Sequence, residues 1–217
     1  MTGALDLQGL KITQGDFVVA ALNLTVAPGE VLTIMGPSGS GKSTLLAALV
    51  GTLAPAFRLE GRLVLAGRDI TTLPPHKRRV GLLFQDDVLF PHLSVGANLA
   101  FALPPSVKGR MARRALVDTA LDQAGLTGFA DRDPATLSGG QRARVALMRT
   151  LLAKPCALLL DEPFSRLDAS LRTQIRAFVL SRIQDEGLPA ILVTHDADDA
   201  RAAGGRVVTP LGCPVAL

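Results

Sequence analysis

The stretch VLTIMGPSGSGKS, residues 31–43, decides the fold of this chain of 217 residues. Its first five residues are an apolar run that predicts a buried strand, and residues 43–50 are expected to form a helix. The glycine-rich segment between them fits the pattern G-x-x-x-x-G-K-[ST], in which backbone N–H groups close around phosphates. An ordinary glycine-rich turn is the alternative, and the Lys-Ser pair in the required place argues against it.

Strand-like and helix-like segments alternate on both sides of this stretch. We expect extended segments at residues 5–13, 17–26, 59–67, 80–84, 157–160 and 191–194, and mainly helical structure over 94–152. Between the last two strands, Leu171, Ile175, Phe178 and Val179 keep the spacing of an amphipathic helix. This order predicts an α/β protein whose mainly parallel sheet is covered by helices, with the helical stretch as an insertion.

Composition narrows the class of protein. Hydrophobic residues make up 48% of the chain and the mean hydropathy is +0.33, which is high for a soluble protein. No stretch approaches the roughly 18 apolar residues that a membrane-spanning helix needs. The N-terminus MTGALDLQGLKIT has no basic start followed by an apolar run, so we expect no signal peptide and a cytosolic chain. The apolar excess predicts a surface that contacts a partner.

The charge pattern decides little by itself. A net charge of +4 and a pI near 9.6 are compatible with nucleic acid or an anionic membrane as a partner. The basic residues, however, are scattered along the chain. Their one short run, residues 76–79 (His-Lys-Arg-Arg), is interpreted as a solvated loop.

Two further motifs contain residues suited to phosphate binding or to catalysis. Leu-Ser-Gly-Gly-Gln at 137–141 opens a predicted helix, where its serine and glycines can turn a hydroxyl and N–H groups toward a phosphate. Residues 158–162, Leu-Leu-Leu-Asp-Glu, are an apolar strand that ends in two carboxylates. Such a strand can deliver Asp161 to a metal ion and Glu162 to an attacking water. A solvated acidic pair at a strand end is the alternative.

With these motifs the sequence resembles the ATP-binding subunits of ABC transporters, and the resemblance extends from the first strand to Val208. It implies the ABC ATPase fold, an α/β P-loop NTPase with a RecA-like core, an antiparallel β portion and an inserted helical subdomain. We expect a single ATP-binding domain over 1–217, with the core at 1–85 and 156–217 and the helical subdomain at 86–155. No C-terminal regulatory domain is expected.

The ligands that the resemblance implies are ATP and Mg²⁺. Lys42 would pair with the β- and γ-phosphates and take part in catalysis, and Ser43, Gln85 and Asp161 would hold Mg²⁺. The residues of the phosphate loop expected to bind the nucleotide are Gly36, Pro37, Ser38, Gly39, Ser40, Gly41, Lys42, Ser43 and Thr44.

Three more catalytic residues are implied. Glu162 would polarise the attacking water, Gln85 would touch the metal and water and sense a membrane partner, and His195 would contact the γ-phosphate. A lone glutamine is more often a surface residue and a lone histidine more often structural. The surrounding segments FQDDVLFPHLSV (84–95) and VTHD (193–196) match the family and favour the functional roles.

The segment Leu-Ser-Gly-Gly-Gln at 137–141 is called the signature loop below. The resemblance implies that it contacts the nucleotide of a second subunit, because two subunits of this family pack head to tail. The expected assembly is a homodimer with two composite ATP sites. Arg166 departs from the family, which usually has a small residue there. The residues expected to bind the nucleotide of the second subunit are Ser138, Gly139, Gly140, Gln141 and Asp168.

The adenine contact is left open by the sequence. The family commonly stacks adenine on an aromatic residue upstream of the phosphate loop, and this chain has no Tyr or Trp. Phe17 is the nearest candidate, although Thr13 aligns closer to that position. A core role for Phe17 is the alternative.

Within the family, the sequence is most similar to ATPases of bacterial importers that use a periplasmic binding protein, in particular the short YnjD type and the thiamine-importer ATPases. The similarity rests on residues 84–95, 133–147 and 163–168. It implies a membrane permease and, through it, a binding protein as partners, no nucleic acid, and a peripheral location on the cytoplasmic face of the bacterial inner membrane. An exporter or lipoprotein-release ATPase is the closer alternative, ahead of a soluble ABC ATPase of DNA repair or translation.

The segment 85–95 joins the core to the insertion. It places Val88, Leu89, Phe90 and Leu93 beside the polar residues 85–87. A loop this apolar is expected either to be buried or to form a docking patch, which the resemblance assigns to a cytoplasmic helix of the permease.

Overall fold

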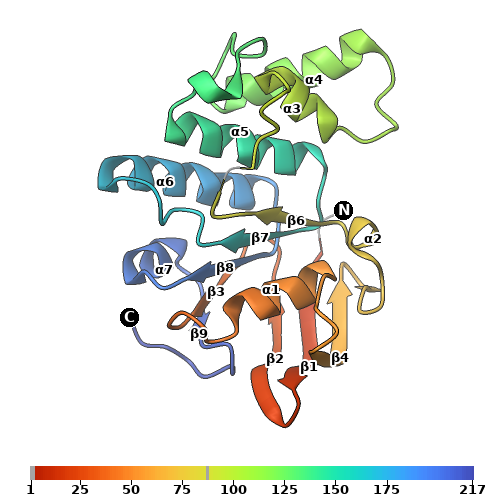
Figure 1. The fold of residues 1–217 in the computed structure, drawn as a ribbon, viewed down its shortest axis with the longest axis vertical. Coiled ribbons are helices and arrows are strands. Elements are labelled where there is room, and N and C mark those ends of the chain that lie inside the picture. The colour runs from red at the N-terminus through yellow and green to blue at the C-terminus, as the bar shows by residue number, and fades with distance from the viewer. Residues whose placement is uncertain (1–2, 87) are drawn as a thin grey trace.

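The computed structural model describes residues 3–86 and 88–217, and its strands form two sheets (Figure 1). The antiparallel sheet has the order β2 (Phe17–Val26), β1 (Leu5–Gln14), β4 (Arg58–Leu65) and β5 (Arg68–Asp69). The parallel sheet has the order β6 (Val80–Leu83), β7 (Ala157–Asp161), β8 (Ala190–Thr194), β3 (Val31–Met35) and β9 (Val207–Val208).

The helices connect and cover these sheets. Figure 1 shows α3, α4 and α5 at one end of the molecule, the parallel sheet in the middle and the antiparallel strands at the other end. The helices are α1 (Lys42–Val50), α2 (Pro75–Arg78), α3 (Val95–Phe101), α4 (Arg110–Gln123), α5 (Gly139–Leu152), α6 (Ala169–Asp185) and α7 (Ala197–Ala203), with a 3-10 turn η1 (Pro134–Thr136).

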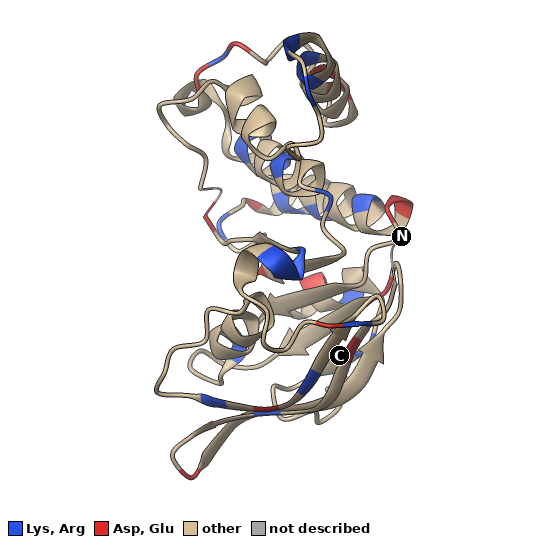
Figure 2. Ribbon diagram, turned by 90° about the vertical axis from the view of Figure 1, so that its right-hand side faces the viewer, with Lys and Arg blue, Asp and Glu red and all other residues tan. Residues whose placement is uncertain are grey.

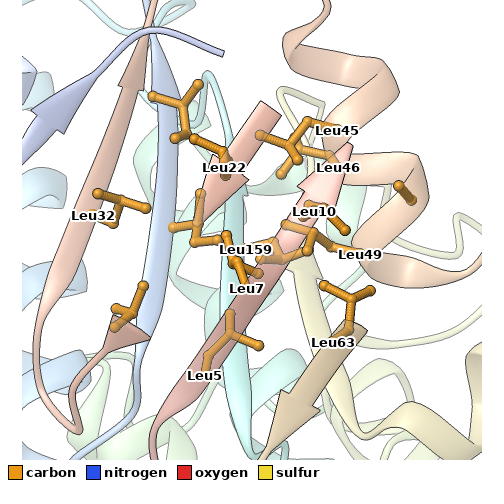
Figure 3. Close-up of a cluster of buried hydrophobic side chains, with 14 of the residues drawn as sticks. Leu5, Leu7, Leu10, Leu22, Leu32, Leu45, Leu46, Leu49, Leu63 and Leu159 are labelled. Carbon is orange, nitrogen blue, oxygen red and sulfur yellow. The ribbon is translucent and has the colours of Figure 1, made fainter. Parts of the chain in front are cut away.

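A first apolar core lies between the two sheets and α1 (Figure 3). Leu10 of β1, Leu63 of β4 and Leu159 of β7 are fully buried there together with Leu45 and Leu49 of α1. Because α1 is enclosed by both sheets, its apolar residues do not form a single stripe. This packing holds the helix that follows the phosphate loop.

A second core lies on the other face of the parallel sheet, beneath α5 and α6. Leu158 and Leu160 of β7 pack there with Ile175 and Val179 of α6, whereas Leu159 faces the first core. The central strands are therefore buried on both faces, which explains why they read as unbroken apolar runs.

A third core joins α3, α4 and α5. Val145 and Met148 of α5 belong to it, whereas Leu147 of the same helix packs in the second core. The two faces of α5 thus connect the helical end of the molecule to the sheet. The α/β class with a mainly parallel sheet is confirmed, and the division into a core and a subdomain stays a prediction.

One sequence expectation is only partly right. His76, Lys77 and Arg79 are exposed as expected, but Pro75–Arg78 form α2 and the Arg78 side chain is buried. It donates hydrogen bonds to the carbonyls of Ala48 and Leu49 at 2.7 and 3.0 Å. These carbonyls belong to the last turn of α1, where no partner exists within the helix, and the helix dipole favours a cation there. Burial lowers the pKa of Arg78.

The surface carries mixed charge. Lys and Arg residues are spread over the helices and the antiparallel sheet, with Asp and Glu among them (Figure 2). Within the described part of the chain, none of the helices has both the length and the apolar character needed to cross a bilayer.

Candidate active site

The phosphate loop runs from the end of β3 to the start of α1. Gly39 and Gly41 have φ angles of +78° and +94°, a left-handed conformation that residues with a side chain rarely adopt. A Cβ atom on Gly41 would also lie 2.6 Å from Cγ1 of Val19, a residue of β2. Glycine at these two positions therefore sets the path of the loop.

Lys42 is held inside this loop. Its side chain is buried, and its Nζ donates to the carbonyl oxygens of Gly36 at 2.7 Å and Pro37 at 2.9 Å. The ammonium group is thereby fixed within a ring of backbone, where phosphate oxygens can become further acceptors.

Two unsatisfied groups show that the loop fits a phosphate. The first is the N-terminus of α1, which has no side-chain cap and lines the cavity described below. The N-termini of α2 and α4 also lack a side-chain cap, whereas Ser94, Ser138, Asp168 and Asp196 cap α3, α5, α6 and α7. The second is the buried Ser40 Oγ, which has no hydrogen-bond partner. Uncapped N–H groups and a helix dipole attract anions. The phosphates of a nucleotide would satisfy both groups.

The loop forms the floor of a cavity of about 630 Å³. Phe17, Phe57 and Leu211 supply apolar walls, and Glu162 reaches the same cavity. Phe17 is 74% exposed, so the core role considered for it is wrong. Thr13 lines a different hollow, with Lys11, Arg58 and Glu60 among its neighbours. Phe57 and Leu211 escape sequence reasoning because they lie on loops outside every motif.

The carboxylate pair lies at the end of β7, where Asp161 is the last residue of the strand and Glu162 follows it in a strained conformation. Glu162 has a φ of +46°, and its backbone N–H donates to the carbonyl of Val193 at 2.9 Å. Its Oε2 lies 3.2 Å from Nδ1 of His195, which follows β8. Left-handed φ at a non-glycine residue costs about 1–3 kcal/mol and persists where neighbours enforce it. The structure thus brings Glu162 and His195, two predicted catalytic residues, together at the ends of neighbouring strands.

Asp161 is electrostatically linked to the phosphate loop. Burial raises its pKa, the negative charge of Glu162 raises it further, and the positive charge of Lys42 opposes both. A divalent cation beside this carboxylate would favour its ionised form. Ser43 and Thr44 line the cavity at the start of α1. A hydroxyl and a carboxylate are the hard oxygen donors that suit Mg²⁺.

Gln85 does not line this cavity. It borders a second hollow of about 400 Å³, together with Gly139, Arg142 and Arg166. Its Nε2 donates to Ser165 Oγ at 3.1 Å, and this hydroxyl donates to the carbonyl of Glu162 at 2.9 Å. Ser165 therefore links the glutamine to the catalytic strand end, and no sequence signal had singled it out.

The signature residues form the start of α5. Ser138 and Gln141 cap each other's backbone, with Gln141 Oε1 accepting from the Ser138 N–H at 3.0 Å. A Cβ on Gly140 would lie 2.4 Å from Leu171 Cδ1, so this glycine lets α5 approach α6. A Cβ on Gly139 would meet its nearest neighbours only at 3.9 Å. Packing within the chain thus explains why residue 140 is a glycine, but it does not explain the glycine at position 139.

Asp168 and Arg166, in the loop before α6, each contact another part of the chain. Asp168 Oδ1 accepts from the Leu171 N–H at 3.0 Å, and this bond lowers the pKa of Asp168. Arg166 forms an ion pair with Asp86, so the unusual arginine connects this loop to the segment that carries Gln85. Both partners are exposed, and such pairs typically contribute no more than about 1 kcal/mol.

The segment after Gln85 is held by a buried amide. Asn98 Oδ1 accepts from the Phe90 N–H at 2.8 Å, and its Nδ2 donates to the carbonyl of Leu93 at 3.1 Å. The half-buried Phe90 ring packs edge-to-face on the exposed Phe101 ring, with centroids 4.9 Å apart. Asp87, which was included in this segment, lies outside the described residues.

The three catalytic strand ends meet at one edge of the parallel sheet. Met35 is in register with Thr194, and Asp161 with Val193, so the phosphate loop, the carboxylate pair and His195 leave the same edge. Open α/β sheets bind ligands at the carboxyl ends of their strands. A phosphate loop with a strand-end carboxylate pair in this position defines the class of P-loop nucleotide hydrolases.

Comparison with known proteins narrows this class to one family. Residues 19–165 match the family model described as ABC transporter, and the chain belongs to this family. It is 53% identical to the uncharacterized ABC transporter ATP-binding protein YnjD of Escherichia coli, over 83% of each chain. It is 44% identical to the thiamine import ATP-binding protein ThiQ of Cereibacter sphaeroides, over 94% of this chain and 87% of that one.

A third relative is longer. The Fe(3+) ions import ATP-binding protein FbpC of Agrobacterium fabrum is 41% identical over 95% of this chain, which spans 58% of that relative. The chain is thus an ABC transporter ATPase and ATP is its nucleotide, as the sequence motifs predicted.

Proposed function

We propose that this chain is the ATP-hydrolysing subunit of a bacterial importer that works with a separate membrane permease and a periplasmic binding protein. Relatives whose names state import, ThiQ and FbpC, support this direction of transport over export. The observation that carries the hydrolytic role is the Glu162 carboxylate at the phosphate-loop cavity, 3.2 Å from His195. The chain would lie on the cytoplasmic face of the inner membrane, bound through the permease.

We assign the chemistry to residues already placed. Lys42 and the N-terminus of α1 bind the β- and γ-phosphates. Ser43 and Asp161 would hold Mg²⁺, which neutralises phosphate charge when bound. Gln85, whose amide donates to Ser165 and borders the neighbouring hollow, would join these ligands after turning toward the cavity. Glu162 orients and polarises the attacking water, and His195 steadies the Glu162 carboxylate and contacts the γ-phosphate. Ser165 positions Gln85 relative to this end of β7.

The active assembly proposed is a homodimer with two composite sites. Gly139 and Gln85 line the same hollow, whereas the phosphate loop lines the other cavity. Within one chain the signature and the phosphate loop therefore do not share a cavity. A second chain packed head to tail would place Ser138, Gly139, Gly140, Gln141 and Asp168 against the nucleotide.

Copurification of the native complex from membranes tests the partner. A polytopic permease retained with the chain, and ATP hydrolysis stimulated by a binding protein, are the expected results. Recovery of nucleic acid or ribosomes with a permease-free chain would point to a soluble ABC ATPase. A permease complex that exports, or that releases lipoproteins, would reverse the proposed direction.

The exposed Phe17 ring is proposed to stack on the adenine base. Phe17→Ala should weaken ATP binding by about 1–3 kcal/mol, the range found for base–aromatic stacking. Because the ring is exposed, the melting temperature should stay unchanged. Isothermal titration with ATP and a thermal melt measure the two quantities. Phe101→Ala is the matched control, since Phe101 is 69% exposed at the other end of the molecule. An unchanged Kd for Phe17→Ala would remove the ring from the site.

Phe90 is proposed to form part of the permease docking patch with the exposed Val88 and Phe101. Phe90→Asp should leave ATP binding intact, release the subunit from its permease and reduce stimulated hydrolysis to the level of the isolated subunit. Pull-down with the permease and turnover in membranes measure both effects.

A control separates docking from folding in the Phe90 experiment. Met111→Asp changes a side chain that is 88% exposed on α4 and should leave assembly unchanged. A misfolded Phe90→Asp protein would show that the ring belongs to the core. A folded Phe90→Asp protein that still assembled and transported would contradict the docking role.

A further inference from the structure

The residues after β9 fold back into a tight turn beside the nucleotide cavity. The Thr209 N–H donates to the carbonyl of Cys213 at 2.8 Å, and the Gly212 N–H donates to the carbonyl of Thr209 at 2.9 Å. Beyond the turn, the Val215 N–H donates to the carbonyl of Val207 at 2.9 Å. The turn 209–213 is therefore closed by its own backbone and tied to the parallel sheet.

This turn is also fixed to the wall and floor of the cavity. The Ala21 N–H of β2 donates to the carbonyl of Pro210 at 2.9 Å, and the buried Pro210 ring lies 3.6 Å from where a Cβ on Gly36 would stand. Gly212 has a φ of +78°, and a Cβ there would lie 3.0 Å from the carbonyl oxygen of Ala21. The turn is thus held between β2 and the first residue of the phosphate loop.

Leu211 stands between these two anchored residues and is not among the residues that pack in the three cores. It is 53% exposed and lines the same cavity as Phe17, Phe57 and the phosphate loop. An apolar side chain on an anchored turn loses little freedom when a ligand covers it, which favours binding. The face of a nucleobase is the apolar part of ATP that such a wall can cover.

We infer that Leu211 contacts the adenine base of bound ATP, so that the turn 209–213 forms one wall of the nucleotide site. The inference rests on the base-side role proposed for Phe17, because both side chains line the cavity above the phosphate loop. It assigns part of the site to a segment that lies outside all motifs of the family.

The test compares three ligands in the full chain. Leu211→Ala should raise the Kd for ATP roughly three- to tenfold, as expected for the loss of part of an apolar contact. Its affinity for tripolyphosphate and for ribose 5-triphosphate, which lack the base, should stay at the wild-type value. Leu217→Ala is the matched control, because Leu217 is 46% exposed, follows the turn 209–213 and does not line the cavity. A thermal melt of each variant establishes that the turn still folds.

The possible results of this experiment separate the role of Leu211 from the role proposed for Phe17. Wild-type ATP affinity in a folded Leu211→Ala protein, with binding weakened in Phe17→Ala, would overturn the role of Leu211 alone. Equal losses for ATP and ribose 5-triphosphate would contradict the base contact. With tripolyphosphate affinity unchanged they would assign Leu211 to the sugar, and with it lowered they would assign the effect to the phosphate loop. A wild-type chain that bound ATP no better than tripolyphosphate would instead contradict the base pocket of the proposed function.

Discussion

Glu162→Gln is expected to lower ATP turnover by about 10²–10⁴-fold, the usual effect of removing a general base. The amide keeps the size of the carboxylate, and its oxygen can still accept from His195, which lies 3.2 Å away in the wild-type chain. ATP binding should survive. The charge of Glu162 raises the pKa of Asp161, so its removal makes Asp161 easier to ionise and leaves the metal ligand intact. The variant should therefore accumulate as an ATP-bound dimer.

Two measurements in the assembled complex check this result, namely phosphate release and ATP affinity by equilibrium binding. Glu186→Gln is the matched control, because Glu186 caps the exposed C-terminal end of α6 and touches neither cavity. It should leave turnover unchanged. Near-normal turnover by Glu162→Gln would mean that another group activates the water.

Mixed dimers should recover activity that neither parent has. Lys42→Ala removes the ammonium group from the phosphate loop. Ser138→Asp keeps a good N-cap for α5 but places a negative charge against the phosphate of the partner's nucleotide. Each homodimer should lose hydrolysis. In a heterodimer, the intact phosphate loop of one chain meets the intact signature of the other, so one of the two sites is complete.

Random mixing gives heterodimers for half of the population, so about a quarter of the wild-type composite sites should return. Turnover of equal mixtures, compared with each parent alone, measures the recovery. If signature and phosphate loop acted within one chain, every site in the mixture would be broken and no activity would return. Strong hydrolysis by a wild-type protein that light scattering shows to be monomeric at saturating ATP would also contradict the composite site.

Much of the core could be predicted because its strands are buried on both faces. The limits of β3, an apolar run buried on both faces, agree with the sequence expectation. The limits of β2 agree as well, although β2 is a partly buried edge strand, because turn residues bound it on both sides. The N-terminus of α1 follows from the glycines and Lys42 alone. The position of Phe17 could not be decided in this way, because a phenylalanine at the start of a strand can face either the core or a ligand.

The remaining contacts depend on how distant loops approach each other. Ser165 links Gln85 to Glu162 through a hydroxyl that any surface loop could carry. Asn98 orders residues 90–93 from inside α3, and a single buried asparagine has no signature in the sequence. Arg78 belongs to a basic run that resembles a solvated loop, and only the nearby end of α1 makes its burial favourable.

The position of β3 in its sheet also determines at which stage of synthesis the chain can bind ATP. β3 and the phosphate loop leave the ribosome early, but both neighbours of β3, β8 and β9, are made more than a hundred residues later. Until then the backbone groups of β3 lack their partners, and pairing strands so far apart in sequence is slow. We therefore expect the phosphate loop to hold its binding shape only once β8 and β9 have been made. A nascent chain that lacks these two strands should not bind ATP.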